Sequence, residues 1–105
     1  MGKNRTRESL IREITNIIVH EIVAKHTNKP ESVHFLESEI IEYRGRAEKT
    51  SKKYNWNADD EEYIEKRALK IIKEKLATKY PDVKYLEKEA ISKLREMIKE
   101  MIIEY

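Results

Sequence analysis

Cysteine is absent from the chain, and glycine and proline occur only twice each among 105 residues. Without cysteine there is no disulfide framework, no thiolate metal site and no thiol nucleophile. Folds rich in turns, such as all-β sandwiches, need many more glycine and proline residues than this. The two glycines, Gly2 and Gly45, are also too far apart to form a glycine-rich loop that cradles phosphate. These absences favour helices. They exclude enzymes that use a thiol nucleophile, a thiolate-bound metal or a glycine-rich phosphate-binding loop.

Long apolar runs are missing as well, although enough aliphatic residues are present for a core. No stretch of about 18 apolar residues occurs, so we expect no helix that spans a membrane. Ile, Val, Leu and Phe make up 25 of the 105 residues, which exceeds the content of roughly 20% below which a highly charged chain stays disordered. We therefore expect one soluble, cytoplasmic helical domain over residues 1–105, with residues 1–5 as a disordered tail.

Charged residues form 40% of the chain, but 22 Lys and Arg against 20 Asp and Glu leave a net charge of only +2. Abundant Glu and Lys without Cys or Gln is typical of proteins from heat-loving organisms, so we expect a thermophilic source. The small total hides a separation of charge along the chain. Residues 44–53 are predominantly basic, and they follow a segment whose charged residues are all acidic, namely Glu31, Glu37, Glu39 and Glu42. Such asymmetry favours oriented association with a partner.

The spacing of apolar residues predicts four helices. They cover about residues 6–26, a second segment from residue 30, a third from an N-cap at Asn57, and a fourth from residue 82 nearly to the C-terminus. The second helix either ends at Gly45 or continues to Lys53, since glycine costs a helix about 1 kcal/mol relative to alanine. Short connections join these segments. The predicted fold is all-α, a four-helix up-down bundle made of two helical hairpins.

Surplus apolar surface predicts that the bundle is oligomeric. The first predicted helix is apolar around more than half of its circumference, and further apolar residues lie off the main stripe near the C-terminus. Such surfaces are commonly buried between subunits. We therefore predict a homodimer, or a complex with another protein, in which the chain acts as an assembly module. The predicted interface residues are Ile11, Val19, Val23, Met101 and Ile103.

A basic segment followed by aromatic residues suggests nucleic-acid binding as the alternative function. Cations would neutralise phosphates while flat rings stack on unpaired bases. The same pattern arises where basic residues complement the negative end of a helix and a tryptophan covers the end of a bundle. Lys3, Arg5 and Arg7 either extend this patch or belong to a solvated tail. The candidate nucleic-acid-binding residues are Arg44, Arg46, Lys49, Lys52, Lys53, Tyr54 and Trp56.

No pattern of residues in the chain predicts catalysis. The dipeptide His20-Glu21 is not followed by a second histidine at position 24, so the zinc-protease motif H-E-x-x-H is missing. A di-iron bundle would need two copies of Glu-x-x-His, and only Glu31 and His34 have this spacing. No serine lies in the G-x-S-x-G motif of hydrolases. We therefore expect a protein that is not an enzyme and that uses no metal and no cofactor.

Overall fold

The computed structural model describes residues 2–27 and 29–103, apart from the side chains of Pro30 and Ile103, and these residues form helices and turns without any strand. The helices are α1 (Gly2–His26), α2 (Pro30–Ser51), α3 (Ala58–Lys79) and α4 (Glu87–Ile98), and α4 continues into the π-helical turn η1 (Lys99–Ile103). The prediction of an all-α fold is confirmed.

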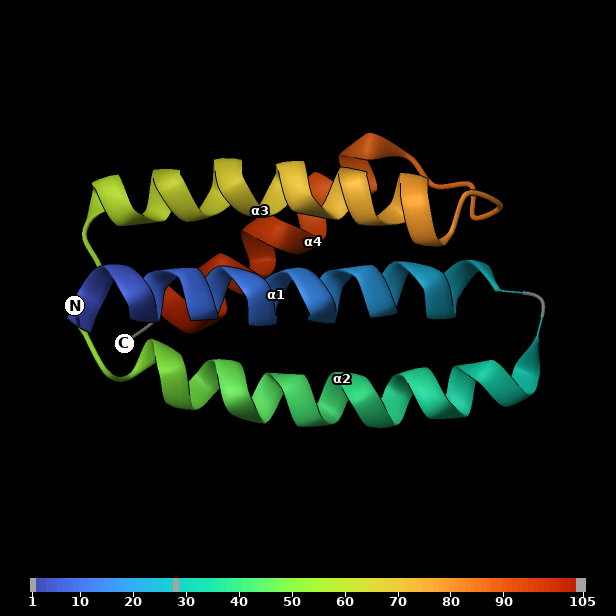
Figure 1. The fold of residues 1–105 in the computed structure, drawn as a ribbon, viewed down its shortest axis with the longest axis horizontal. Coiled ribbons are helices and arrows are strands. Elements are labelled where there is room, and N and C mark those ends of the chain that lie inside the picture. The colour runs from blue at the N-terminus through green and yellow to red at the C-terminus, as the bar shows by residue number, and fades with distance from the viewer. Residues whose placement is uncertain (1, 28, 104–105) are drawn as a thin grey trace.

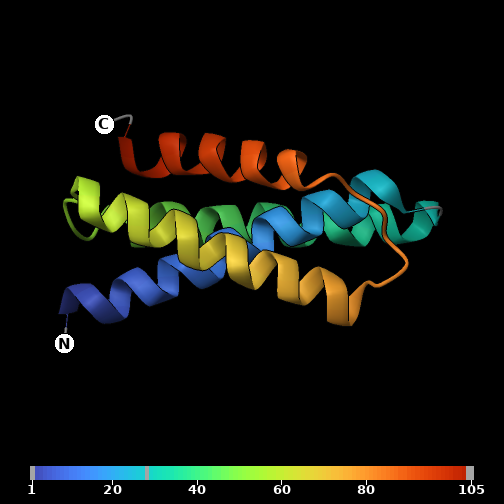
Figure 2. The same ribbon diagram turned by 90° about the horizontal axis from the view of Figure 1, so that it is seen from above.

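Consecutive helices run in opposite directions, and α1 occupies the centre of the arrangement (Figure 1). Helix α1 contacts α2, α3 and α4, and its contact with α2 is the most extensive. Figure 2 shows α4 on one side of the molecule, where it contacts α1 and α3. The start of α1, the α2–α3 connection and η1 lie at one end of the molecule, and the other two connections lie at the opposite end. The central position of α1 explains why its sequence is apolar around so much of its circumference.

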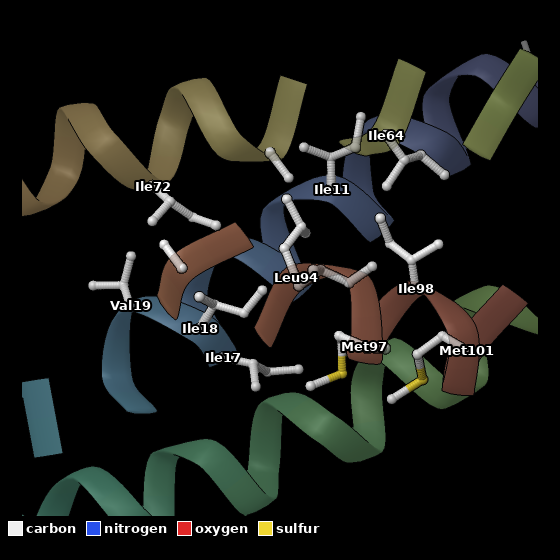
Figure 3. Close-up of a cluster of buried hydrophobic side chains, with 14 of the residues drawn as sticks. Ile11, Ile17, Ile18, Val19, Ile64, Ile72, Leu94, Met97, Ile98 and Met101 are labelled. Carbon is white, nitrogen blue, oxygen red and sulfur yellow. The ribbon is translucent and has the colours of Figure 1, made fainter. Parts of the chain in front are cut away.

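The core draws its buried side chains from every helix, with the largest share from α1. Figure 3 shows Ile11, Ile17 and Ile18 of α1 in one cluster with residues of α3 and α4. In α3, four predicted core residues are fully or almost fully buried, namely Ile64, Ala68, Ile72 and Leu76. Their spacing of four residues places them on one face of the helix, as the apolar pattern predicted.

Helix α1 begins at Gly2, four residues before residue 6, where the sequence predicted its start. The structure therefore places residues 2–5, which we expected to form a tail, in a helix. Two contacts account for this: Lys3 pairs with the carboxylate of Asp60, and the backbone of Gly2 packs against the ring of Tyr54. A Cβ atom added to Gly2 would lie 2.5 Å from the Tyr54 hydroxyl oxygen, so a larger residue at this position would require the Tyr54 side chain to shift.

Helix α2 passes through Gly45 and ends at Ser51, which settles the alternative that the sequence left open. The residues around Gly45 pack against the rest of the molecule, since Ala47 is fully buried and Thr50 is 7% exposed. This packing outweighs the cost of about 1 kcal/mol for a helical glycine. The last turn gains two side-chain hydrogen bonds, from the Thr50 hydroxyl to the Arg46 carbonyl and from the Ser51 hydroxyl to the Glu48 carbonyl.

The fourth helix begins at Glu87, five residues later than Asp82, where the sequence predicted its start. Residues 80–86 instead form a turn and an extended segment, in which the Val83 amide donates to the Tyr80 carbonyl. Leu86 is the N-cap residue and has extended backbone, with φ −92° and ψ 136°. Its side chain is therefore 62% exposed rather than in line with the apolar stripe of α4. A fourth helix that began at residue 82 would place Leu86 on the apolar stripe shared with Leu94, and the structure shows that this expectation is wrong.

Candidate functional site

The candidate nucleic-acid-binding residues differ in the contacts that they make within the chain. The Arg44 guanidinium points toward η1, where its Nη1 atom lies 3.2 Å from Glu100, and its Nη2 atom lies 3.9 Å from Glu21. Arg46 forms an ion pair on its own helix with Glu42, four residues earlier. Only the remaining cations, Lys49, Lys52 and Lys53, are exposed and form no ion pair with the described residues. Both arginines thus have carboxylate partners within the chain.

The two candidate stacking residues, Tyr54 and Trp56, pack within the α2–α3 connection. Their ring centroids lie 6.1 Å apart in an edge-to-face arrangement. The Trp56 indole N–H donates a 2.8 Å hydrogen bond to the Ser51 carbonyl, and the ring packs against the hydrophobic core. The Lys3 ammonium lies 5.7 Å from the centroid of the same ring. Trp56 therefore closes one end of the bundle, as the structural interpretation of this segment predicted.

A buried carboxylate, Asp60, organises the same end of the molecule. Asn57 is the N-cap of α3, and it exchanges two hydrogen bonds with Asp60: the Asp60 amide donates to Asn57 Oδ1 at 2.8 Å, and the Asn57 amide donates to Asp60 Oδ2 at 3.1 Å. Lys3 lies 2.8 Å from Oδ2 and Arg7 lies 2.9 Å from Oδ1, while Asp60 itself is 5% exposed. This carboxylate therefore ties α1 to the start of α3.

The charge state of Asp60 follows from these contacts. Burial acts to raise the pKa of Asp60, but the hydrogen bonds from Lys3, the Asn57 amide and Arg7 outweigh it, so that the pKa lies below its ordinary value. The sequence predicted the N-cap at Asn57 correctly. It gave no sign that Asp60, rather than the neighbouring acids, would be buried beside α1, because Lys3 and Arg7 are distant in sequence.

The three histidines are separated from one another and have structural neighbours. The His20 ring lies 5.8 Å from the Tyr43 ring, and His34 is exposed on α2. His26 lies 2.9 Å from Glu89, which also pairs with Lys25. Burial acts to raise the pKa of Glu89, whereas hydrogen bonds from His26 and Lys25 lower it below its ordinary value. Within residues 2–27 and 29–103, no three His, Asp or Glu side chains gather in a way that could hold a metal ion.

The residues predicted to form a subunit interface lie inside a single chain. Ile11 is 2% exposed, Val19 3%, Val23 6% and Met101 4%. Ile11, Val19 and Val23 of α1 and Met101 of η1 all belong to the hydrophobic core, so they offer no surface to a partner. The side chain of the fifth predicted interface residue, Ile103, lies outside the part of the chain that the structure describes.

An exposed row of residues that includes one large apolar side chain remains on α2. This helix contacts α1 and η1, and its opposite side has no neighbouring helix (Figure 1). Along that side run Glu37, Ile41, Gly45 and Lys49, spaced four residues apart and all exposed, and we call this row the outer stripe of α2. Ile41 is 72% exposed, the largest fraction among the exposed large hydrophobic residues of the described chain. A large exposed aliphatic residue between charges of opposite sign is the main candidate for contact with a partner.

Comparison with protein-family models, with curated proteins and with solved structures reveals no significant match to this chain. None of the helices in the described ranges is long and apolar enough to cross a membrane. Functional inference therefore rests on the residues of this chain alone.

Proposed function

We propose that this chain is a non-enzymatic, cytoplasmic assembly module that forms a homodimer. The observation that supports the proposal is the outer stripe of α2, where Ile41 is 72% exposed on a helix that is covered by the rest of the chain on one side only. Isolated exposed aliphatic residues are common on monomeric proteins. Here the residue lies in the middle of a helix whose two halves carry opposite charge, which favours a specific, oriented contact over chance exposure.

Self-association predicts a molar mass of two chains in solution. We expect light scattering coupled to gel filtration to give twice the 12.6 kDa of one chain at micromolar concentrations. Dilution should shift the mass toward one chain, because a single-helix contact of modest area dissociates readily. A mass of one chain at every concentration up to about 100 µM, on the order of the weakest affinity expected of such a contact, would contradict the proposal.

Nucleic-acid binding is the second candidate function, favoured by the three exposed lysines at the end of α2, namely Lys49, Lys52 and Lys53. The chain contains a single tryptophan, Trp56, which lies close to them in sequence and reports on this end of the molecule. Because the Trp56 ring is held by Ser51 and Lys3, we expect its fluorescence to stay unchanged when a single-stranded oligonucleotide is added at low salt. A saturable change that weakens as salt rises would instead support nucleic-acid binding.

A further inference from the structure

We propose, building on the self-association above, that two copies of the chain pack their α2 helices against each other in an antiparallel arrangement, with Ile41 of each copy seated on Gly45 of the other. The two-fold axis would then cross α2 at the boundary between its acidic and its basic half. Three observations lead to this arrangement: the uncovered side of α2, the space above Gly45 and the order of charges along the helix.

Helix α2 has one buried side and one exposed side, and the exposed side includes an apolar residue as well as polar ones. Leu36 and Ala47, which are 6% and 0% exposed, face the core. The outer stripe lies on the opposite side and is exposed along its whole length. A helix of 22 residues is about 33 Å long at 1.5 Å per residue, which is long enough for several turns of contact with a second copy.

Gly45 provides a place where a second helix can approach closely. A Cβ atom built at this position meets nothing within 4 Å, so the site opens to solvent and its backbone is uncovered. Ile41 lies one helical turn earlier and is 72% exposed. Suppose that the α2 helices of two copies lie antiparallel and that the two-fold axis passes midway between positions 41 and 45. Each Ile41 then contacts the Gly45 of the other copy. The symmetric contact therefore buries two isoleucine side chains and covers two stretches of exposed backbone.

The order of charges selects the antiparallel direction. The charged residues before position 43 in α2 are all acidic, namely Glu31, Glu37, Glu39 and Glu42, whereas those from position 44 are predominantly basic. Arg44, Arg46 and Glu42 are already paired within the chain, so the outer stripe carries the charges of Glu37 and Lys49. A parallel pair would place Glu37 near Glu37 and Lys49 near Lys49, which is repulsive. The antiparallel register that seats Ile41 on Gly45 also places Glu37 opposite Lys49. Neither Glu37 nor Lys49 forms an ion pair with the described residues of its own chain, so both are available to the other copy.

The same charges disfavour a strand of nucleic acid along α2. A phosphate backbone would gain from Lys49 and the neighbouring lysines but would meet the acidic half of the helix within a few turns. An antiparallel second copy of α2 would place a charge of opposite sign opposite both the acidic and the basic half of the helix. This is the reason to assign the outer stripe to self-association.

Charge reversal tests the arrangement with an internal control. Each substitution alters two contacts, because the two-fold axis repeats them. We expect Glu37→Lys alone, and Lys49→Glu alone, to weaken dimer formation about tenfold or more at roughly 50 mM salt, where surface charges are little screened. An equimolar mixture of the two variants should recover the wild-type dissociation constant, because each would then meet the opposite charge. The double variant, Glu37→Lys with Lys49→Glu, should recover it without mixing.

Two substitutions test the apolar contact without disturbing the fold of one chain. Gly45→Gln occupies open space and is a better helix former than glycine, so it should leave the helical content unchanged or raise it while weakening dimer formation about tenfold. Ile41→Gln should weaken dimer formation similarly. Leu86→Gln is the matched control, since Leu86 is 62% exposed and lies outside α2, and it should leave the dissociation constant unchanged.

The outcomes separate this inference from the proposed function on which it rests. Weakened single variants and a recovered mixture would support the antiparallel α2 contact. A wild-type dimer that is insensitive to all four positions would overturn the contact and leave self-association standing. A wild-type chain that is monomeric would overturn both, whether or not it binds an oligonucleotide through Lys49.

Discussion

Replacing Leu94 by alanine is expected to lower the free energy of unfolding by about 2 to 5 kcal/mol. Leu94 lies on α4, is fully buried and belongs to the cluster around Ile11 and Ile18 of α1 (Figure 3). Removing its side chain takes apolar surface out of the core and leaves a cavity that the surrounding helices fill only in part. Because α4 is only 12 residues long, it depends on few such contacts. Urea denaturation followed by circular dichroism measures the loss.

Leu86→Ala provides a matched control for this prediction. The sequence places Leu86 and Leu94 on the same apolar stripe, two turns apart, whereas the structure leaves Leu86 62% exposed. We therefore expect Leu86→Ala to change the free energy of unfolding by no more than about 0.5 kcal/mol. Equal losses for the two variants would mean that α4 begins earlier than Glu87 and that Leu86 packs in the core. All variants are compared at one protein concentration, since association adds to the apparent stability.

The sequence sufficed to predict the helices whose apolar residues follow a regular period and whose ends carry strong signals. Asn57 followed by acidic residues marked the start of α3 correctly, because an Asx cap and the helix dipole act locally. The start of α4 was placed wrongly at Asp82. The apolar period continues backward through Leu86 and Val83, and nothing local shows that these residues adopt extended backbone.

The arrangement of the helices was harder to predict than their positions, and this affected the candidate site. A helix that is apolar on many sides fits a subunit interface and a central position in one chain equally well. The sequence favoured an interface for Val19 and Val23, but three helices surround α1 and bury both residues. The separation of charge in α2 was visible from the start. The sequence could not show which side of α2 is exposed. The structure shows that the outer stripe is uncovered and that Gly45 lies within the helix.

The contacts of Asp60 lead to the second prediction of a large effect. Asp60→Ala removes the hydrogen bond that the Asn57 amide donates to Asp60 Oδ2, although the backbone amide of residue 60 still donates to Asn57 Oδ1. It also leaves the partly buried cations of Lys3 and Arg7 without their shared partner. Loss of one such hydrogen bond costs about 1 kcal/mol, and loss of one member of a buried ion pair costs more. Since Lys3 is partly exposed and can be solvated, we expect a combined loss of about 2 to 3 kcal/mol, measured by urea denaturation at pH 7. Asp59→Ala removes the same charge from an exposed neighbouring position and should cost no more than about 0.5 kcal/mol.

The dependence of this loss on pH identifies the charge of Asp60 as its cause. In the folded chain, the pKa of Asp60 lies below its ordinary value, which is about 4 in the unfolded chain. A group whose pKa is lowered by folding stabilises the folded state above the unfolded pKa, and this stabilisation is lost as the pH falls through the folded pKa. The difference in free energy of unfolding between the wild-type chain and Asp60→Ala should therefore be constant from pH 7 to about pH 5 and should shrink below about pH 4. A difference that stayed constant down to pH 2.5 would show that the charge of Asp60 does not stabilise the fold and that its side chain acts through packing alone.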